Sequence, residues 1–161
     1  MTLKGNVSVT DLQLEAQPAF SKQPESFDGV SITVLEDRSI VSIATPNGGD
    51  EALAKAVQAA FSTDVPPVGQ SASATANNTL FLRLAQDQMF AQFDQQSTGT
   101  PTSIIAAALE DTAYLTDQSD SWATLRVQGP LCLAALQRIC SLDLHPDQFP
   151  PGRAVRTVME H

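Results

Sequence analysis

The sequence has few basic residues, and lysine in particular is scarce. Its 161 residues include nine Lys or Arg against 18 Asp or Glu, so the formal net charge is −9. Three lysines in the whole chain cannot form a cationic stripe along a polyphosphate. We therefore predict no nucleic acid and no anionic membrane among the partners.

Long apolar runs are also missing, and cysteine is scarce. No window approaches the ~20 apolar residues of a membrane-spanning helix, and the first residues lack the apolar run of a signal peptide. Cys132 and Cys140 fall on one predicted helix, where they are ~12 Å apart along the axis and beyond the reach of a disulfide. We predict that both thiols are buried as small apolar residues, which fits a reducing compartment. The prediction is a cytoplasmic protein.

The first 29 residues differ from the rest because they contain few large apolar side chains. Pro18 and Pro24 interrupt them, and only the stretch 7–14 alternates weakly. We predict that residues 1–29 form an N-terminal arm that becomes ordered across a partner. Residues 30–161 are predicted to form one domain, since a chain of this length can bury a core of its own.

Strand and helix signals alternate within this domain. Two strands are predicted on either side of a charged turn at 36–38, and later strands at 80–84, 89–93, 114–116, 122–127 and 154–159. Helices are predicted at 50–61, capped by Asp50, and at 131–140, with a shorter one that Thr102 or Ser103 caps. Residues 70–78 are small and polar, which predicts a loop.

The two longer predicted helices carry the same apolar stripe, with spacings of three, one, three and one. The stripe residues are Leu53, Ala56, Val57, Ala60 and Phe61 in the first helix and Cys132, Ala135, Leu136, Ile139 and Cys140 in the second. The predicted fold class is α+β, with two ββαβ-like (ferredoxin-like) halves and helices on one face of an antiparallel-rich sheet.

Histidine and serine do not form a familiar catalytic pattern. His145 and His161 lack the Cys/His/Asp spacing of a metal site. We interpret His145 as a loop residue or local cap, with a functional role as the alternative, and His161 as a terminal residue. Neither a GxSxG motif nor a paired Cys/His signature occurs. The sequence therefore predicts no catalytic, cofactor-binding or metal-binding residue in this chain.

Two polar segments resemble sites but have simpler interpretations. Asp117, Ser119 and Asp120 lie between predicted strands, where such residues form turns; a catalytic cluster is the alternative. The Pro-Asn-Gly-Gly segment at 46–49 precedes a helix but lacks the spacing of a phosphate-binding loop, which favours a plain strand-to-helix turn.

The aromatic residues allow two uses. Core packing is the usual role of rings in or beside strands, and stacking on a pterin or flavin is the alternative. The residues concerned are Phe81, Phe90, Phe93, Tyr114 and Trp122.

Five segments of the chain resemble one known family, both in their residues and in the order in which they occur. They are DRSIVSIATP, LFLRLAQDQMFAQF, IIAAALEDTAYLTDQSDSWATLRVQGP, RICSLDLHPDQFPPG and RTVMEH. Their sequence is similar to that of the gamma subunit of bacterial heterotetrameric sarcosine oxidase, a relative of the folate-binding domain of aminomethyltransferases. The most specific part is DQSDSWATLRVQGP followed by LDLHPDQFPPG.

This resemblance implies a subunit of an enzyme that demethylates sarcosine oxidatively to glycine. The products include hydrogen peroxide and either formaldehyde or methylene-tetrahydrofolate. It implies no cofactor in this chain, with FAD, FMN, NAD, zinc and tetrahydrofolate held by partner subunits, the alpha, beta and delta subunits. The gamma subunit itself is implied to be structural and non-catalytic.

The chain departs from the family by stopping at His161, where the family continues. The resemblance therefore implies either a domain without its C-terminal end or a short subunit whose open sheet edge a partner covers. Two other functions stay open: a stand-alone folate-binding module and an interaction domain without an enzyme partner.

Overall fold

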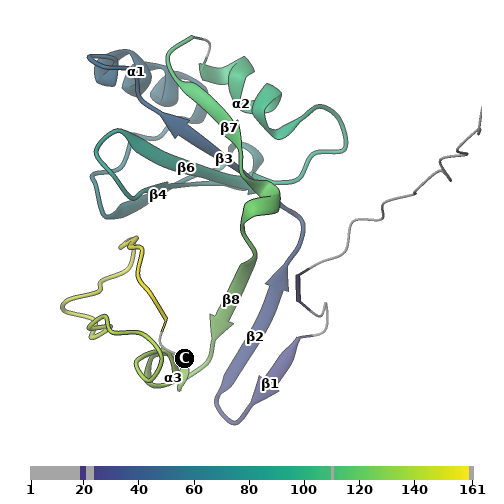
Figure 1. Cartoon of the computed structure of the whole chain (residues 1–161), viewed down its shortest axis with the longest axis vertical. Coiled ribbons are helices and arrows are strands. Elements are labelled where there is room, and N and C mark those ends of the chain that lie inside the picture. Colours follow the sequence, from purple (N-terminus) through teal and green to yellow (C-terminus); the bar gives the residue numbers. More distant parts are fainter. Residues whose placement is uncertain (1–18, 21–23, 110, 160–161) are drawn as a thin grey trace, which may run out of the picture.

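A computed structural model describes residues 19–20, 24–109 and 111–159 of the chain. Over these residues the chain forms two antiparallel sheets and three α-helices (Figure 1). The predicted α+β fold class is confirmed, and the arrangement is consistent with two ferredoxin-like halves.

The larger sheet has five strands, and both predicted hairpin strands lie in it. In spatial order the strands are β4 (Gln70–Ala74), β5 (Thr79–Arg83), β6 (Gln88–Asp94), β3 (Arg38–Ala44) and β7 (Tyr114–Asp117). The β5–β6 hairpin closes with a hydrogen bond from the Ala85 N–H to the Gln88 carbonyl oxygen (3.3 Å). All neighbouring strands of this sheet are antiparallel.

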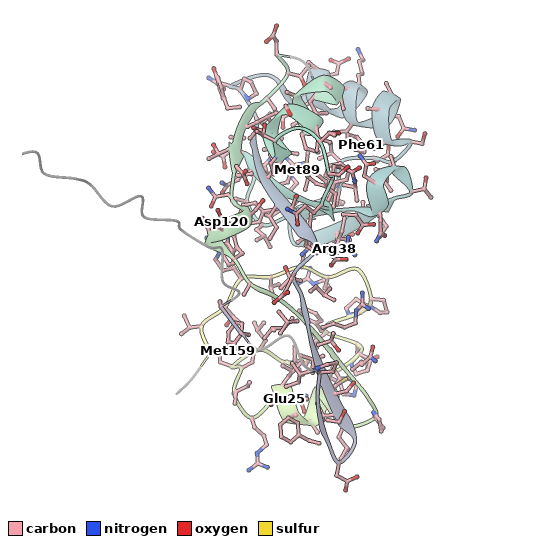
Figure 2. The ribbon with its side chains drawn as sticks, turned by 90° about the vertical axis from the view of Figure 1, so that its right-hand side faces the viewer. Glu25, Arg38, Phe61, Met89, Asp120 and Met159 are labelled. Carbon is pink, nitrogen blue, oxygen red and sulfur yellow. The ribbon has the colours of Figure 1, made fainter. Side chains whose placement is uncertain are left out.

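Two helices, α1 (Asp50–Phe61) and α2 (Pro101–Leu109), cover one face of the five-stranded sheet (Figure 1). Phe61 of α1 meets Phe81 of β5 edge-to-face, with ring centroids 5.1 Å apart. The buried cluster beneath the helices consists of Val41, Ile43, Leu53, Val57, Phe61, Ala74, Phe81, Met89, Ala91, Phe93, Ile105 and Leu109. Figure 2 shows Phe61 and Met89 inside this layer. The main core therefore lies between one sheet face and two helices.

The starts of these helices differ from the prediction in their caps. The N-cap of α1 is Gly49, not Asp50, and it makes no side-chain cap bond. Asp50 lies in the first turn instead, where a carboxylate favours the positive end of the helix dipole. At the start of α2, Thr100 replaces the predicted Thr102 or Ser103, because Thr100 Oγ1 accepts from the Ser103 N–H and Ser103 Oγ accepts from the Thr100 N–H.

The predicted loop at 70–78 is wrong in its first half. Residues Gln70–Ala74 form strand β4, and Ala76–Asn78 form a short 3₁₀ turn, η1. Small polar side chains gave no strand signal there, but the backbone pairs along β5 over the whole of β4. Tertiary pairing overrides a weak local propensity.

The smaller sheet has three strands in the order β1 (Glu25–Phe27), β2 (Val30–Leu35) and β8 (Thr124–Gln128). Strand β1 lies inside the span that the sequence assigns to the arm, and it pairs with β2. The alternating stretch 7–14 lies outside the described residues. The division into arm and domain stays a prediction.

The second predicted helix is shorter than its stripe indicates. Helix α3 spans Cys132–Leu136, and irregular turns continue to Cys140. It contacts β2 and does not cover the five-stranded sheet. Ile139 of the stripe is exposed, and the other four stripe residues are half-buried. The stripe therefore faces a thin layer, which is too small to hold a longer helix.

The predicted last strand at 154–159 is also wrong. The described part of this segment makes no ladder, and the nearby pairing consists of single bridges from Gln70 to Arg153 and from Cys140 to Met159. Ala154 is buried but Val158 is 80% exposed, so the apolar residues of the segment do not share one covering layer. An apolar alternation without a covering layer does not fix a strand.

Candidate binding groove at the sheet junction

The chain crosses between the two sheets twice, and the second crossing is bonded to β3, the strand that follows the first. Residues 36–37 connect β2 to β3, and the 3₁₀ turn η2 (Ser119–Ser121) connects β7 to β8. The Ile40 N–H of β3 donates to Ser119 Oγ (3.1 Å), and the Gln118 N–H donates to the Ile40 carbonyl oxygen (2.8 Å). Figure 2 shows Asp120 and Arg38 at this level of the molecule, between its two parts.

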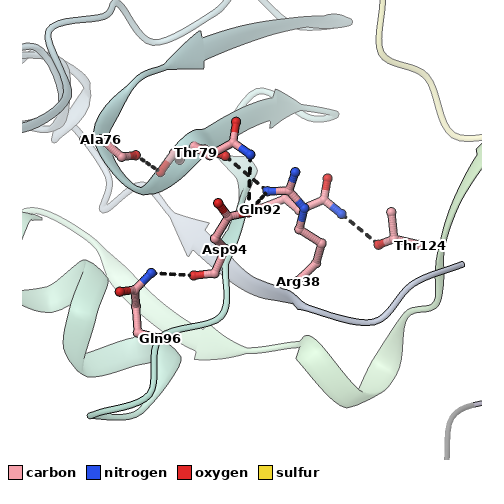
Figure 3. Close-up of polar contacts among 8 residues, drawn as sticks. Arg38, Ala76, Thr79, Gln92, Asp94, Gln96 and Thr124 are labelled. Atoms are coloured by element: carbon pink, nitrogen blue, oxygen red, sulfur yellow. Dashed lines mark hydrogen bonds and ion pairs between the residues drawn. The ribbon is translucent and has the colours of Figure 1, made fainter.

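Side chains of the larger sheet extend this connection. Gln92 Nε2 of β6 donates to Thr124 Oγ1 of β8 (2.7 Å), a direct bond from one sheet to the other (Figure 3). Arg38 at the start of β3 pairs with Asp94 on the register-matched end of β6, with 2.7 Å between Nη1 and Oδ1. The Gln92–Thr124 bond joins the two sheets, whereas the Arg38–Asp94 pair ties two strands of the large sheet together beside it.

A groove lies where the two sheets meet, on the face of the large sheet that α1 and α2 leave open. We call it the junction groove; its volume is about 440 Å³. Its walls come from the large sheet, the crossing after η2, strand β8 and the C-terminal segment. The lining residues are Ile40, Leu82, Leu84, Phe90, Gln92, Trp122, Ala123, Thr124, Leu125, Val155, Arg156, Thr157 and Met159. Most of them are apolar, and Arg156 is the one charged residue among them.

Trp122 is the central side chain of this region. Its ring meets the Phe90 ring edge-to-face, with 5.7 Å between the ring centroids. The Arg156 guanidinium carbon lies 5.2 Å from the centroid of the Trp122 ring, which is a cation–π contact. Trp122 also lines a second hollow of about 410 Å³, bordered by Phe20, Glu36 and Arg38. Trp122 as a whole stays 45% exposed, so this arrangement offers an apolar surface to a ligand or partner.

The turn roles predicted for Asp117 and Ser119 are confirmed. Asp117 Oδ1 accepts from both the Ser119 N–H (2.9 Å) and the Ser119 hydroxyl (2.7 Å). Asp120 borders the 410 Å³ hollow. The segment 46–49 is likewise a turn, closed by a bond from the Gly49 N–H to the Pro46 carbonyl oxygen (2.8 Å).

The interpretation of His145 as a local cap is also confirmed. The His145 N–H donates to Asp143 Oδ1 (2.9 Å), and its Nδ1 accepts from the Asp147 N–H (3.4 Å). His161 lies outside the described residues. Cys132 and Cys140 are free thiols and only half-buried, so the expectation that both are buried is wrong. Among the described residues, no three His, Cys, Asp or Glu side chains are placed to hold a metal ion.

The five aromatic residues separate into core and surface. Phe81 and Phe93 are fully buried under the helices, which confirms their core role. Tyr114 is 71% exposed on the edge strand β7, and Trp122 lies just before β8 rather than in it. Core packing is therefore wrong for these two. Phe90 points to the opposite sheet face from Phe81 and lines the junction groove.

Arg156 and the groove leucines were missed from the sequence. One signal was present: in LFLRL, apolar side chains fall on both faces of the strand, which is typical of a strand covered on both sides. Nothing local indicates that Arg156 lies over Trp122, because the two are 34 positions apart and meet only through the fold.

The comparisons with known proteins agree with this fold. The chain is 31% identical over 105 residues to the sarcosine oxidase subunit gamma of Arthrobacter sp., which is 65% of this chain and 51% of that protein. The resemblance to the gamma subunit is confirmed. The chain thus spans about half the length of this curated relative.

The structure is similar to a chain of the heterotetrameric sarcosine oxidase from Corynebacterium sp. U-96, solved in complex with pyrrole 2-carboxylate. The TM-score is 0.64 at 24% sequence identity, over 81% of this chain and 65% of that one. This likeness establishes the fold. No family model matches the chain. No helix of the described residues has the length and apolar character to cross a membrane.

Proposed function

We propose that this chain is a non-catalytic gamma-type subunit of a heterotetrameric sarcosine oxidase. The observation that carries the proposal is the similarity over 105 residues to the gamma subunit from Arthrobacter sp.. The fold shared with a heterotetrameric sarcosine oxidase supports it. In this proposal the assembly works in the cytoplasm and demethylates sarcosine oxidatively to glycine, with hydrogen peroxide and either formaldehyde or methylene-tetrahydrofolate as further products.

The proposed partners are the alpha, beta and delta subunits, which hold FAD, FMN, NAD, zinc and tetrahydrofolate. The polar residues that most resemble a site in this chain support such a division of roles. Asp117 and Ser119 bond to each other within a turn, and His145 Nδ1 accepts from the Asp147 N–H in its own loop. Local bonds of this kind account for the Asp and Ser side chains as turn formers. The chain contributes surface to the assembly rather than chemistry.

Coexpression with the alpha, beta and delta subunits of the same organism tests the proposal. The chain is expected to co-elute with them, while the chain purified alone is colourless and produces no peroxide from sarcosine. A yellow isolated chain with sarcosine-dependent peroxide production would contradict the non-catalytic role. Recovery of no flavoprotein with the tagged chain would favour an interaction domain of another kind.

One observation favours the second candidate, a stand-alone folate-binding module. The junction groove brings Phe90, Trp122 and Arg156 together around about 440 Å³, which suits a flat anionic ligand. A folate site also needs an acid facing the pterin, and none of the described residues that line the groove carries a carboxylate. We therefore place this candidate second.

Isothermal titration of the isolated chain with tetrahydrofolate separates the two candidates. No heat of binding is expected at micromolar protein. Micromolar affinity that Trp122→Ala removes would assign the groove to folate and reverse the order of the two functions.

A further inference from the structure

The junction groove is an apolar surface that the described chain leaves uncovered. On its other face the same sheet buries Phe81 and Phe93 completely beneath α1 and α2. In the groove, Leu125 is 44% and Met159 is 52% exposed. A sheet with apolar residues on both faces needs a covering layer on both. The groove therefore has the character of a surface that another element covers.

We propose that the junction groove docks an apolar segment of another subunit, and that this segment brings a carboxylate to Arg156. The inference rests on the proposed function, because it assumes that the chain works inside an assembly. It adds the surface through which the assembly forms and the chemistry of the segment that fits there.

The charge of the occupant follows from Arg156. Its guanidinium lies over the Trp122 ring at 5.2 Å, and none of the ion pairs formed by the described residues involves it. A purely apolar cover would bury this cation without a counter-charge, at a large desolvation cost. A carboxylate from the occupant removes that cost and makes a charge-assisted hydrogen bond. Trp and Arg are also among the residue types enriched at the centre of interfaces.

A second copy of this chain fits the groove poorly. In a two-fold contact the same surface faces itself, so the counter-charge of each Arg156 would have to come from the groove of the other copy. None of the described residues that line the groove is acidic. A different chain with a carboxylate is the complementary occupant.

The test compares two charge reversals in the full chain. Arg156→Glu reverses the groove cation. Arg126→Glu makes the same change on β8, opposite Thr33 and outside the groove, and Arg126 also takes part in none of the described ion pairs. Both variants are to be coexpressed with the alpha, beta and delta subunits. In a second measurement, each variant is purified alone, and its affinity for an assembly of the other three subunits is determined.

We expect Arg156→Glu to weaken association at least tenfold and Arg126→Glu to change it less than threefold. Val155→Asp, at the groove wall, is expected to act like Arg156→Glu. Hydrogen exchange of the wild-type chain should show new protection at 82–92, 122–125 and 153–157 on assembly. Circular dichroism melting of each free variant checks that it folds; if Arg156→Glu does not fold, Arg156→Gln and the exchange map decide.

The outcomes separate the two claims. Assembly with no new protection in the groove, or equal effects of both reversals, overturns this inference and leaves the proposed function standing. Failure of the wild-type chain to assemble overturns the proposed function and this inference with it. A self-dimer of the isolated chain that Arg156→Glu disrupts would assign the groove to a second copy and overturn the inference as well.

Discussion

A Cβ atom built on Gly129 would lie 2.5 Å from the carbonyl oxygen of Gly29. Gly29 forms the turn between β1 and β2, and Gly129 follows β8, so the two backbones touch where the small sheet ends. The same carbonyl oxygen accepts from the Leu131 N–H (3.0 Å), which leads the chain into α3. Gly129 also has φ of +121°, where side chains are strained.

Gly129→Ala is therefore expected to destabilise the chain by about 3 kcal/mol, the upper end for strained backbone, because the clash adds to the strain. Gly48→Ala is the matched control. Gly48 also has positive φ, but nothing lies within 4 Å of its Cβ position, so the cost should be about 1 kcal/mol. Urea unfolding of both variants measures the difference. Equal losses would contradict the close approach of the two backbones.

A Leu→Ala substitution in the stripe of α1 and one in the stripe of α3 should lower the free energy of unfolding by different amounts. Leu53 in α1 is 2% exposed, and Leu136 in α3 is half-buried. Leu53→Ala should cost about 2–5 kcal/mol, as a cavity in a packed core does. Leu136→Ala should cost less than about 1.5 kcal/mol, because solvent already reaches that side chain. Thermal melting of both variants decides; a larger loss for Leu136→Ala would show that α3 is the better buried helix.

These stripes also show what the sequence could and could not predict. The same three, one, three, one spacing gives a twelve-residue helix at Asp50–Phe61 and only five residues at Cys132–Leu136. The spacing reports that one side of a helix is apolar, but it does not report how large a layer lies opposite. The first helix packs on the five-stranded sheet, and the second contacts chiefly β2 of the three-stranded sheet.

Strands were predictable where side chains carried the pattern. The hairpin of β5 and β6 follows from two apolar runs around a polar turn and was predicted almost to its ends. Strand β4 has the sequence QSASA, so its existence depends on pairing with β5 rather than on its own side chains. The C-terminal stretch is the opposite case: its apolar residues predicted a strand, but Val155 and Val158 stay exposed and no ladder forms in its described part.

The candidate groove was the least predictable feature. Trp122 was singled out from the sequence, but its contacts with Phe90 and Arg156 come from three segments that meet only in the folded chain. A single sequence carries no record of such long-range contacts. The turn residues Asp117 and Ser119 were predictable because their bonds are local.

Ser119 is predicted to stabilise the crossing between the sheets rather than any chemistry. Its Oγ accepts from the Ile40 N–H and donates to Asp117. Ser119→Ala removes both bonds and should cost about 1–3 kcal/mol, since a part-buried N–H loses its partner. Ser121→Ala in the same turn, on an exposed side chain, should cost less than about 0.5 kcal/mol. Denaturant midpoints measure both, and a Ser119→Ala variant as stable as wild type would remove the structural role.

The boundary of the predicted arm can be located by two truncations. Removal of residues 1–23 keeps β1, and we expect the melting temperature of the isolated chain to stay within about 1 °C. Removal of residues 1–28 deletes β1, which exposes the edge of β2 and the Val30 and Ile32 side chains. That loss should be about 1 kcal/mol, or roughly 2–4 °C for a domain of this size. Both truncations should weaken association with the partner subunits if the arm lies across them, whereas only the second should change stability. A large loss of stability in the shorter truncation would instead place part of residues 1–23 in the folded core, because only a packed segment can contribute more than its own ordering costs.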